Sequence, residues 1–144
     1  MIMQIIVSIV ATISFAVRFH VPRGEYVYCA INGTLGWVAY WFFINHEVSV
    51  SVASLAATFI MAILSRILSI LRKCPATVFL VTGIFTLVPG AGIYSTAYYL
   101  ITGDITLFTE KGIETFKIAG AIVLGIVFGF ALPQIWFNKL AKRK

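Results

Sequence analysis

Five long apolar stretches, separated by short polar connections, dominate the hydropathy pattern of this chain. Each stretch approaches or exceeds the roughly 17 to 25 residues that a helix needs to cross the hydrocarbon core of a bilayer. The pattern therefore predicts an all-α integral membrane protein with transmembrane helices over residues 1–17, 26–44, 48–71, 77–101 and 116–137. Because these stretches use almost the whole chain, we expect a single transmembrane helical domain over residues 1–144.

The fourth stretch contains a run that disfavours a continuous helix, Pro89-Gly90-Ala91-Gly92. Proline has no amide proton and clashes with the preceding turn, and glycine permits unusual backbone angles, so we expect the helix to break over these four residues. Freed backbone groups at membrane depth need partners in the protein or in a polar cavity, and transporters use such breaks to bind substrates. A kink that only accommodates neighbouring helices, or an ordinary turn, is the alternative interpretation.

The break predicts a substrate site that consists of helix dipoles and hydroxyl groups. If a second half-helix begins at Ile93, its free amides point into the gap and attract carboxylates. Hydroxyl and aromatic side chains lie within one or two turns of the gap, and we expect two hydroxyls of the third stretch on the opposite wall. The predicted substrate-binding residues are Pro89, Gly90, Ala91, Gly92, Tyr94, Ser95, Thr86, Thr58 and Ser54.

Small and polar residues recur at helical spacing inside four of the stretches, which predicts a face for close packing on each helix. In the third stretch the polar face extends over the whole length, so packing and a substrate pathway remain equal alternatives there. The four faces comprise Gln4, Ser8 and Thr12; Cys29, Gly33, Gly36 and Tyr40; Ser51, Ser54, Thr58, Ala62, Ser65 and Ser69; and Ala121, Gly125 and Gly129.

Apart from Lys117 at the outer end of the fifth stretch, Arg66 is the single charged residue inside one of the apolar stretches. An ionisable group within a membrane is a functional candidate, and an arginine at the inner mouth could attract an anionic substrate. About 18 residues of helix separate Arg66 from Val48, however, and this places it about 27 Å along the crossing. At that depth its side chain can instead extend to the membrane surface.

Composition and charge agree with a membrane location. With 60% hydrophobic and 11% charged residues and a mean hydropathy of +0.99, the chain does not have the composition of a soluble domain. Most of the basic residues that produce the net charge of +6 flank the apolar stretches. This position is typical of signals that orient a protein in the membrane and argues against nucleic-acid binding. Arg18, Arg23, Arg72, Lys73 and the basic residues after 138 share one predicted side, so the N-terminus is expected outside and the C-terminus in the cytoplasm.

The remaining reactive residues do not form an enzyme or metal site. His20 and His46 fall on opposite predicted sides, which excludes a paired-histidine metal site in one subunit, and no Gly-x-Ser-x-Gly or His-Glu-x-x-His motif occurs. We therefore expect neither catalysis nor a cofactor. No acidic residue lies in the middle of a stretch, so a proton-coupling group would have to come from another chain or from a rim residue such as Glu25 or Glu114.

Several runs in this sequence resemble one known family. They are Phe15-Ala16-Val17-Arg18-Phe19 before Pro22-Arg23, Asn32-Gly33-Thr34-Leu35-Gly36-Trp37 with Tyr40, Ala57-Thr58-Phe59, Cys74-Pro75-Ala76-Thr77-Val78-Phe79-Leu80, Leu87-Val88-Pro89-Gly90-Ala91-Gly92-Ile93-Tyr94, and Ile118-Ala119-Gly120-Ala121-Ile122 with Gly125. The chain is similar along nearly its whole length to the small five-span subunit of bacterial threonine/serine exporters, which corresponds to the C-terminal half of longer, single-chain exporters.

This resemblance implies export of small hydrophilic metabolites across the bacterial inner membrane, either amino acids such as threonine and serine or dicarboxylates such as succinate. It also implies a larger membrane partner that resembles the N-terminal half of the single-chain exporters, in an inverted-repeat arrangement. A homo-oligomer of this chain, in addition to the complex with the partner, is a further possible assembly. The alternative function is a non-transporting accessory or scaffold subunit, with the substrate path in the partner alone.

Overall fold

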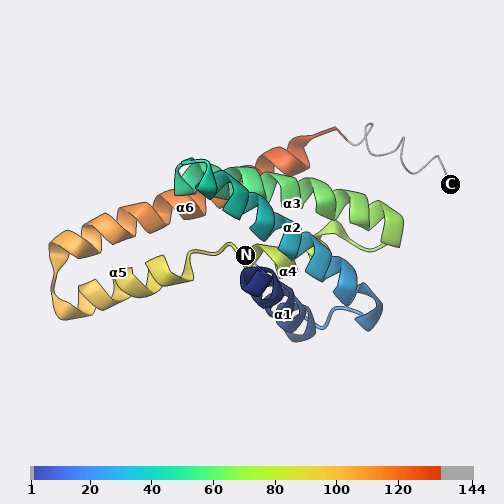
Figure 1. Ribbon diagram of the computed structural model, residues 1–144, viewed down its shortest axis with the longest axis horizontal. Coiled ribbons are helices and arrows are strands. Elements are labelled where there is room, and N and C mark those ends of the chain that lie inside the picture. Colours follow the sequence, from blue (N-terminus) through green and yellow to red (C-terminus); the bar gives the residue numbers. More distant parts are fainter. Residues whose placement is uncertain (1, 134–144) are drawn as a thin grey trace.

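The computed structural model describes residues 2–133, and all regular secondary structure in that range is helical. The elements follow one another along the chain as shown in Figure 1. Their bounds are α1 Ile2–Arg18, the short 3-10 helix η1 Arg23–Glu25, α2 Tyr26–Asn45, α3 Val50–Arg72, α4 Ala76–Ile84, α5 Gly90–Thr102 and α6 Ile105–Ala131. The all-α prediction is therefore confirmed for this part of the chain.

The first three helices occupy the first three predicted stretches, and the last two stretches differ from the prediction. The fourth stretch forms two separate helices, α4 and α5. The fifth helix, α6, begins at Ile105 instead of residue 116, because Asp104 accepts a hydrogen bond from the amide of Leu107 and caps a helix that continues through the charged segment. It ends at Ala131, two residues before Pro133, and residues 134–137 of the predicted stretch lie outside the described range.

Proline and left-handed residues set most of the helix ends. Lys73 adopts a left-handed conformation with φ of 56° after α3, and Pro75 then precedes α4. Gly103 has φ of 79° at the end of α5, a conformation that glycine adopts without strain, so the chain turns tightly into α6. These ends make α5 and α6 an antiparallel hairpin.

Two clusters of buried apolar residues hold α1 to α4 and the second half of α6 together. The larger one joins α3, α4, α6 and the segment after α4 through Ala57, Met61, Ala62, Leu80, Leu87 and Ile122. The smaller one joins α1, α2 and α4 through Ala16, Val21, Cys29 and Phe79. We call this packed part the body of the molecule.

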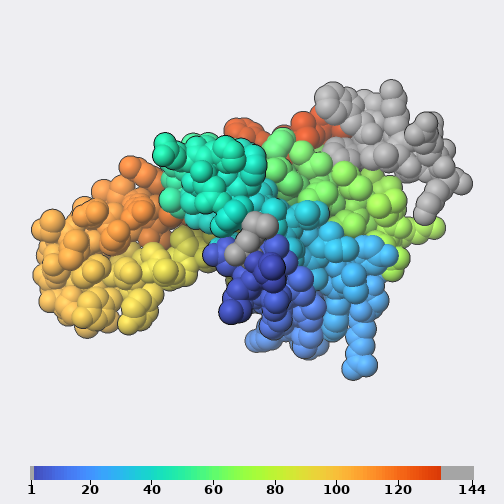
Figure 2. All heavy atoms as spheres, in the orientation of Figure 1, coloured from blue at the N-terminus to red at the C-terminus, as the bar shows by residue number. Residues whose placement is uncertain are grey.

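The hairpin of α5 and the first half of α6 projects from the body as an arm (Figures 1 and 2). It is coloured yellow and orange at one end of both views. None of the residues of α5 is buried, and large apolar side chains such as Ile93, Tyr94 and Ile101 are exposed. An arm with this composition requires lipid or another protein around it.

Three helical segments in the described range are long and apolar enough to cross a membrane: Arg23–Asn45, Val50–Arg72 and Ile105–Ala131. The apolar helix Ile2–Arg18 is shorter, and α4 and α5 are each too short to cross alone. These lengths fit an integral membrane protein.

Candidate functional site

The fourth predicted helix is interrupted over residues 85–89, four residues earlier than the sequence indicated. After α4 the amide of Thr86 donates to the carbonyl of Gly83 at 3.1 Å, and the amide of Leu87 donates to Ile84 at 2.9 Å. These tighter turns end the helix before Pro89 is reached. Pro89 then stands at the N-cap position of α5, where its missing amide proton costs nothing.

The glycines of the predicted break therefore lie inside a helix. Gly90, Ala91 and Gly92 form the first turn of α5, which begins three residues before the Ile93 that we expected. The expected break at Pro89–Gly92 is thus corrected to an interruption at residues 85–89, and only Pro89 belongs to both. The Gly90 amide donates to the carbonyl of Val88 at 2.7 Å. The amides of Ala91 and Gly92, which have no acceptor one turn earlier within α5, still face the interruption, as at any helix N-terminus.

Other predicted site residues are placed on different sides of this interruption. Tyr94 is 71% exposed and stacks on Tyr98, while Ser95 is half-buried. Thr86 lines a cavity against α1 and α2, and its hydroxyl donates to the carbonyl of Gly83 at 2.7 Å. The structure therefore does not gather Thr86 and Tyr94 around one cavity.

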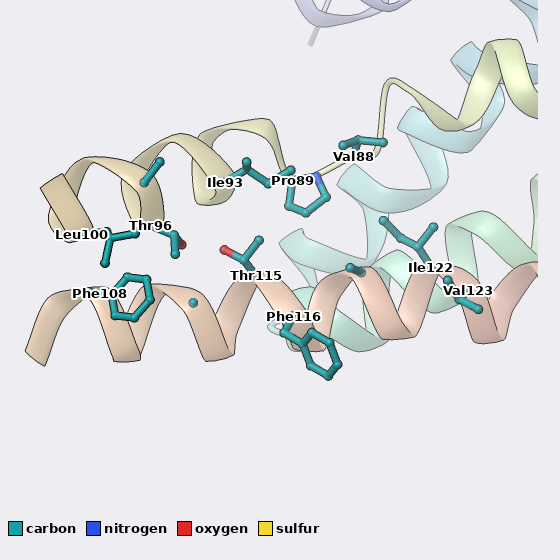
Figure 3. Close-up of a pocket in the computed structure, with 13 residues that line it drawn as sticks. Val88, Pro89, Ile93, Thr96, Leu100, Phe108, Thr115, Phe116, Ile122 and Val123 are labelled. Atoms are coloured by element: carbon teal, nitrogen blue, oxygen red, sulfur yellow. The ribbon is translucent and has the colours of Figure 1, made fainter. Parts of the chain in front are cut away.

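A groove with a volume of about 550 Å³ runs between α5 and α6 on one side of the interruption (Figure 3). We call it the hairpin groove. Its walls are almost entirely apolar, and its two hydroxyls, of Thr96 and Thr115, donate to carbonyls of their own helices at 2.8 and 2.7 Å. The lining residues are Val88, Pro89, Ile93, Thr96, Ala97, Leu100, Phe108, Gly112, Thr115, Phe116, Ala119, Ile122 and Val123.

Thr58 lies on α3 at its contact with α6, and Ser54 lies one turn earlier on α3. Both side chains are buried, and the Thr58 hydroxyl donates to the carbonyl of Ser54 at 2.7 Å. A Cβ atom added to Gly125 would collide with Thr58 Oγ1, so the two helices touch at this point. The middle of the polar stripe on α3 therefore packs against Gly125 and Gly129, and neither Ser54 nor Thr58 lines the hairpin groove.

Arg66 of α3 is buried, and its side chain contacts the C-terminal end of α6. Its Nη1 donates to the carbonyls of Leu132 at 2.7 Å, Gly129 at 3.0 Å and Phe130 at 3.4 Å. The last carbonyls of a helix carry partial negative charge, so the guanidinium stabilises this helix end. These carbonyls are therefore partners for a guanidinium that is buried inside the protein.

A buried amide that the pattern of small residues did not single out connects three helices. Asn32 of α2 is fully buried, and its Nδ2 donates to Ser65 Oγ of α3 at 3.0 Å and to the carbonyl of Phe79 of α4 at 2.9 Å. The signal was present in the sequence, because Asn32 is a lone amide side chain within an apolar stretch.

An ion pair joins two connections that were predicted to share one membrane side. Arg72 Nη2 lies 2.9 Å from Glu25 Oε1, and its Nε donates to Oε2 at 3.0 Å. The Arg72 guanidinium also lies 4.4 Å from the centre of the Tyr28 ring. Glu25, one of the rim residues considered for proton coupling, is therefore held by a cation.

The described residues offer few other groups for metal binding or redox chemistry. Within residues 2–133, no group of three His, Cys, Asp or Glu side chains could hold a metal ion. Both cysteines are free. The arrangement offers helix ends, hydroxyls and apolar grooves, which suit non-covalent binding.

Comparison with known proteins gives one family match. The family described as "Threonine/Serine exporter, ThrE" matches residues 4–131. A curated but uncharacterised protein of Haemophilus influenzae is 28% identical over 134 residues, which cover 90% of this chain and 45% of that protein. The chain thus spans about half the length of this curated relative. No solved structure matches.

Proposed function

The chain belongs to the threonine/serine exporter family, and from this premise we propose that it is a membrane subunit that exports small hydrophilic metabolites together with a larger partner. The family is a transporter family, so a transport role takes precedence over catalysis. The proposed substrates are amino acids such as threonine and serine, or dicarboxylates such as succinate. The proposed location is the bacterial inner membrane.

We propose five crossings, made by α1, α2, α3, the α4–α5 pair and α6. The N-terminus would lie outside and the C-terminus in the cytoplasm, because Arg18, Arg23, Arg72 and Lys73 mark one side. The Glu25–Arg72 ion pair supports this assignment, since it holds the α1–α2 and α3–α4 connections side by side. If this chain and its partner each have an odd number of crossings, they can form an inverted repeat only when the partner has the opposite orientation in the membrane.

The interruption between α4 and α5 carries the proposal for a substrate path. The Gly90 amide donates to the carbonyl of Val88, and the amides of Ala91 and Gly92 have no partner within their helix and face residues 85–89, which gives a partial positive charge at that point. Half-helix ends of this kind bind carboxylates in transporters. We propose that Pro89, Gly90, Ala91, Gly92, Tyr94, Ser95 and Thr86 border the path, with Ser54, Thr58 and Arg66 farther from it.

A partner subunit would complete the path around the arm. The hairpin has an apolar groove, and α5 contributes no buried residue of its own. The curated relative is about twice as long as the matched segment, so it contains further chain that could supply the missing contacts. A second copy of this chain is the other source of such contacts.

The accessory or scaffold role remains the second candidate. It is favoured by the hairpin groove, because a groove whose hydroxyls are all bonded internally suits an apolar partner helix better than a hydrophilic solute. The two roles differ in whether substrate touches this chain.

The test is efflux of labelled threonine, serine and succinate from cells that express this chain alone, the partner alone, or both. The proposal predicts efflux of at least one solute only when both chains are present. Efflux by the partner alone at the same rate would assign the chain to the accessory role. Absence of efflux in all three strains would reject the export function for these solutes.

A further inference from the structure

The first half of α6 continues past the beginning of α3. Two contacts show that these helices run parallel and in register, since Gly125 lies against Thr58 and Gly129 lies against Ala62. In this register α3 begins beside residue 117 of α6. The part of α6 before this residue, about 18 Å of helix, therefore has no part of α3 beside it.

The side of α6 that faces α3 in the body becomes charged in the arm. Glu114 precedes Gly125 by about three turns of helix, and Lys111 precedes Gly129 by about five turns, so both continue the α3 contact face. The two side chains form an ion pair at 3.1 Å, and Glu110 is exposed on the adjacent edge. Because these charges are stabilised by water, this side of the arm belongs in the aqueous phase.

Polar residues of α5 lie on the same side of the arm as these charges. α5 contacts α6 through Gly92, where an added Cβ atom would collide with a threonine of α6. Ser95 and Thr102 are two turns apart and lie together on the charged side of this contact. Ile93 and Leu100, also two turns apart, lie on the other side and line the hairpin groove (Figure 3).

The groove side of the arm is apolar and continuous with an exposed face of the body. Phe116, Val123 and Val127 of α6 share this face, and each is more than half exposed. The two hydroxyls of the groove already donate within their own helices. Hydrocarbon, which offers no hydrogen-bonding groups, can therefore cover this face without leaving a polar side chain unpaired.

A single tilt of α6 places both sides of the arm in suitable surroundings. The 27 residues of α6 give about 40 Å of helix, which exceeds the roughly 30 Å of a bilayer core, and a helix of excess length tilts. A tilt that carries the arm away from α3 turns the charged side toward water and the groove toward the acyl chains. Tyr94 and Tyr98, stacked and exposed on α5, are typical of the membrane interface.

We propose that the arm lies in the interface of the bilayer on the side where α3 begins, with the hairpin groove against the acyl chains of phospholipids. This is the outer interface in the proposed orientation. The inference goes beyond the proposed function and does not depend on which solute is exported. It leaves the charged side of the arm and the outer edge of α5 for a partner subunit.

The test is spin-label accessibility of the full-length chain in liposomes of phosphatidylethanolamine and phosphatidylglycerol, in a Cys74→Ser background. Two matched pairs of label sites are available, Leu100→Cys with Thr102→Cys and Phe116→Cys with Glu114→Cys. The members of each pair are exposed and two residues apart, on opposite sides of one helix.

Collisions with oxygen, which concentrates among acyl chains, should exceed those with a water-soluble nickel complex at Leu100→Cys and Phe116→Cys. The order should reverse at Thr102→Cys and Glu114→Cys. Because these side chains are exposed, the variants should keep the thermal unfolding midpoint of the parent, and each pair is decisive alone.

The inference is overturned if both members of a pair prefer the same reagent, because the arm would then stand in water or lie wholly within hydrocarbon. It is also overturned if the groove labels lose contact with both reagents when the partner is bound, which would assign the groove to a protein helix. Absence of efflux in cells would reject the proposed function and leave this placement of the arm unchanged.

Discussion

Asn32 holds α2 against both α3 and α4 with a single amide group. Its replacement by alanine would leave the Ser65 hydroxyl and the Phe79 carbonyl without this donor and would open a small cavity. We predict that Asn32→Ala lowers the free energy of unfolding by about 2 to 3 kcal/mol, and that Ser65→Ala costs about 1 kcal/mol. Denaturant unfolding in detergent measures both, with Thr34→Val as a control of small expected effect. Equal stability of Asn32→Ala and the parent would contradict the role given to this amide.

Arg66 binds the last carbonyls of α6, so its charge has a structural partner. We predict that Arg66→Met lowers the free energy of unfolding by about 2 to 3 kcal/mol, because the carbonyls lose a charged donor. Arg66→Lys should retain part of this stability, since an ammonium reaches fewer acceptors than the planar guanidinium.

The same pair of variants tests the anion-attracting role predicted for Arg66. A structural role predicts that export falls in proportion to the amount of folded protein. Loss of export by Arg66→Lys at unchanged stability would instead assign the guanidinium to the substrate.

At the scale of elements, α6 packs on α3 through residues that have no room for a larger side chain. A Cβ atom on Gly125 would lie 2.6 Å from the carbonyl oxygen of Leu55, whereas one on Gly120 would meet nothing within 4 Å. We predict that Gly125→Leu abolishes folding or lowers the midpoint of thermal unfolding by more than about 10 °C, while Gly120→Leu leaves it within about 2 °C. Tolerance of leucine at both positions would refute this packing.

The positions of most helices could be predicted because their apolar stretches end at residues that break or cap a helix. Pro22, Pro75 and Gly103 each mark a connection that the structure contains. The packing role of Ala121, Gly125 and Gly129 was equally readable and is confirmed, since all three are buried. The predicted start of the last helix, at residue 116, was wrong. The first turns of α6 carry the charged residues Glu110, Lys111 and Glu114, and a hydropathy pattern assigns such residues to a connection between helices.

The interruption was found but misplaced. The sequence of a Pro-Gly run does not reveal whether the run ends one helix or begins the next. Here α4 ends before Pro89, because the carbonyls of Gly83 and Ile84 accept hydrogen bonds from amides only three residues later. The candidate site was harder to predict, because a stripe of hydroxyls does not identify its neighbour. Thr58 faces Gly125, and Ser8 lines a pocket with Trp37 only because α1 packs beside α2.

At the scale of the whole molecule, the orientation in the membrane is a prediction that labelling can test. Gly24 lies between α1 and α2 with open space around it, and Thr102 is exposed at the far end of α5. In a Cys74→Ser background, where Cys29 is fully buried, a membrane-impermeant maleimide should label Thr102→Cys in intact cells and Gly24→Cys only after lysis. Labelling of Gly24→Cys in intact cells would invert the proposed topology.

The central claim is that the interruption between α4 and α5 lies on the export path. Labelled-threonine efflux from cells that express the chain with its partner tests it most directly, using Gly90→Leu and the control Gly120→Leu. Both positions have open space for the new side chain, so both variants should express and assemble with the partner. The account predicts that Gly90→Leu reduces the initial efflux rate at least tenfold and that Gly120→Leu retains it. Equal, undiminished efflux by the two variants would contradict the account.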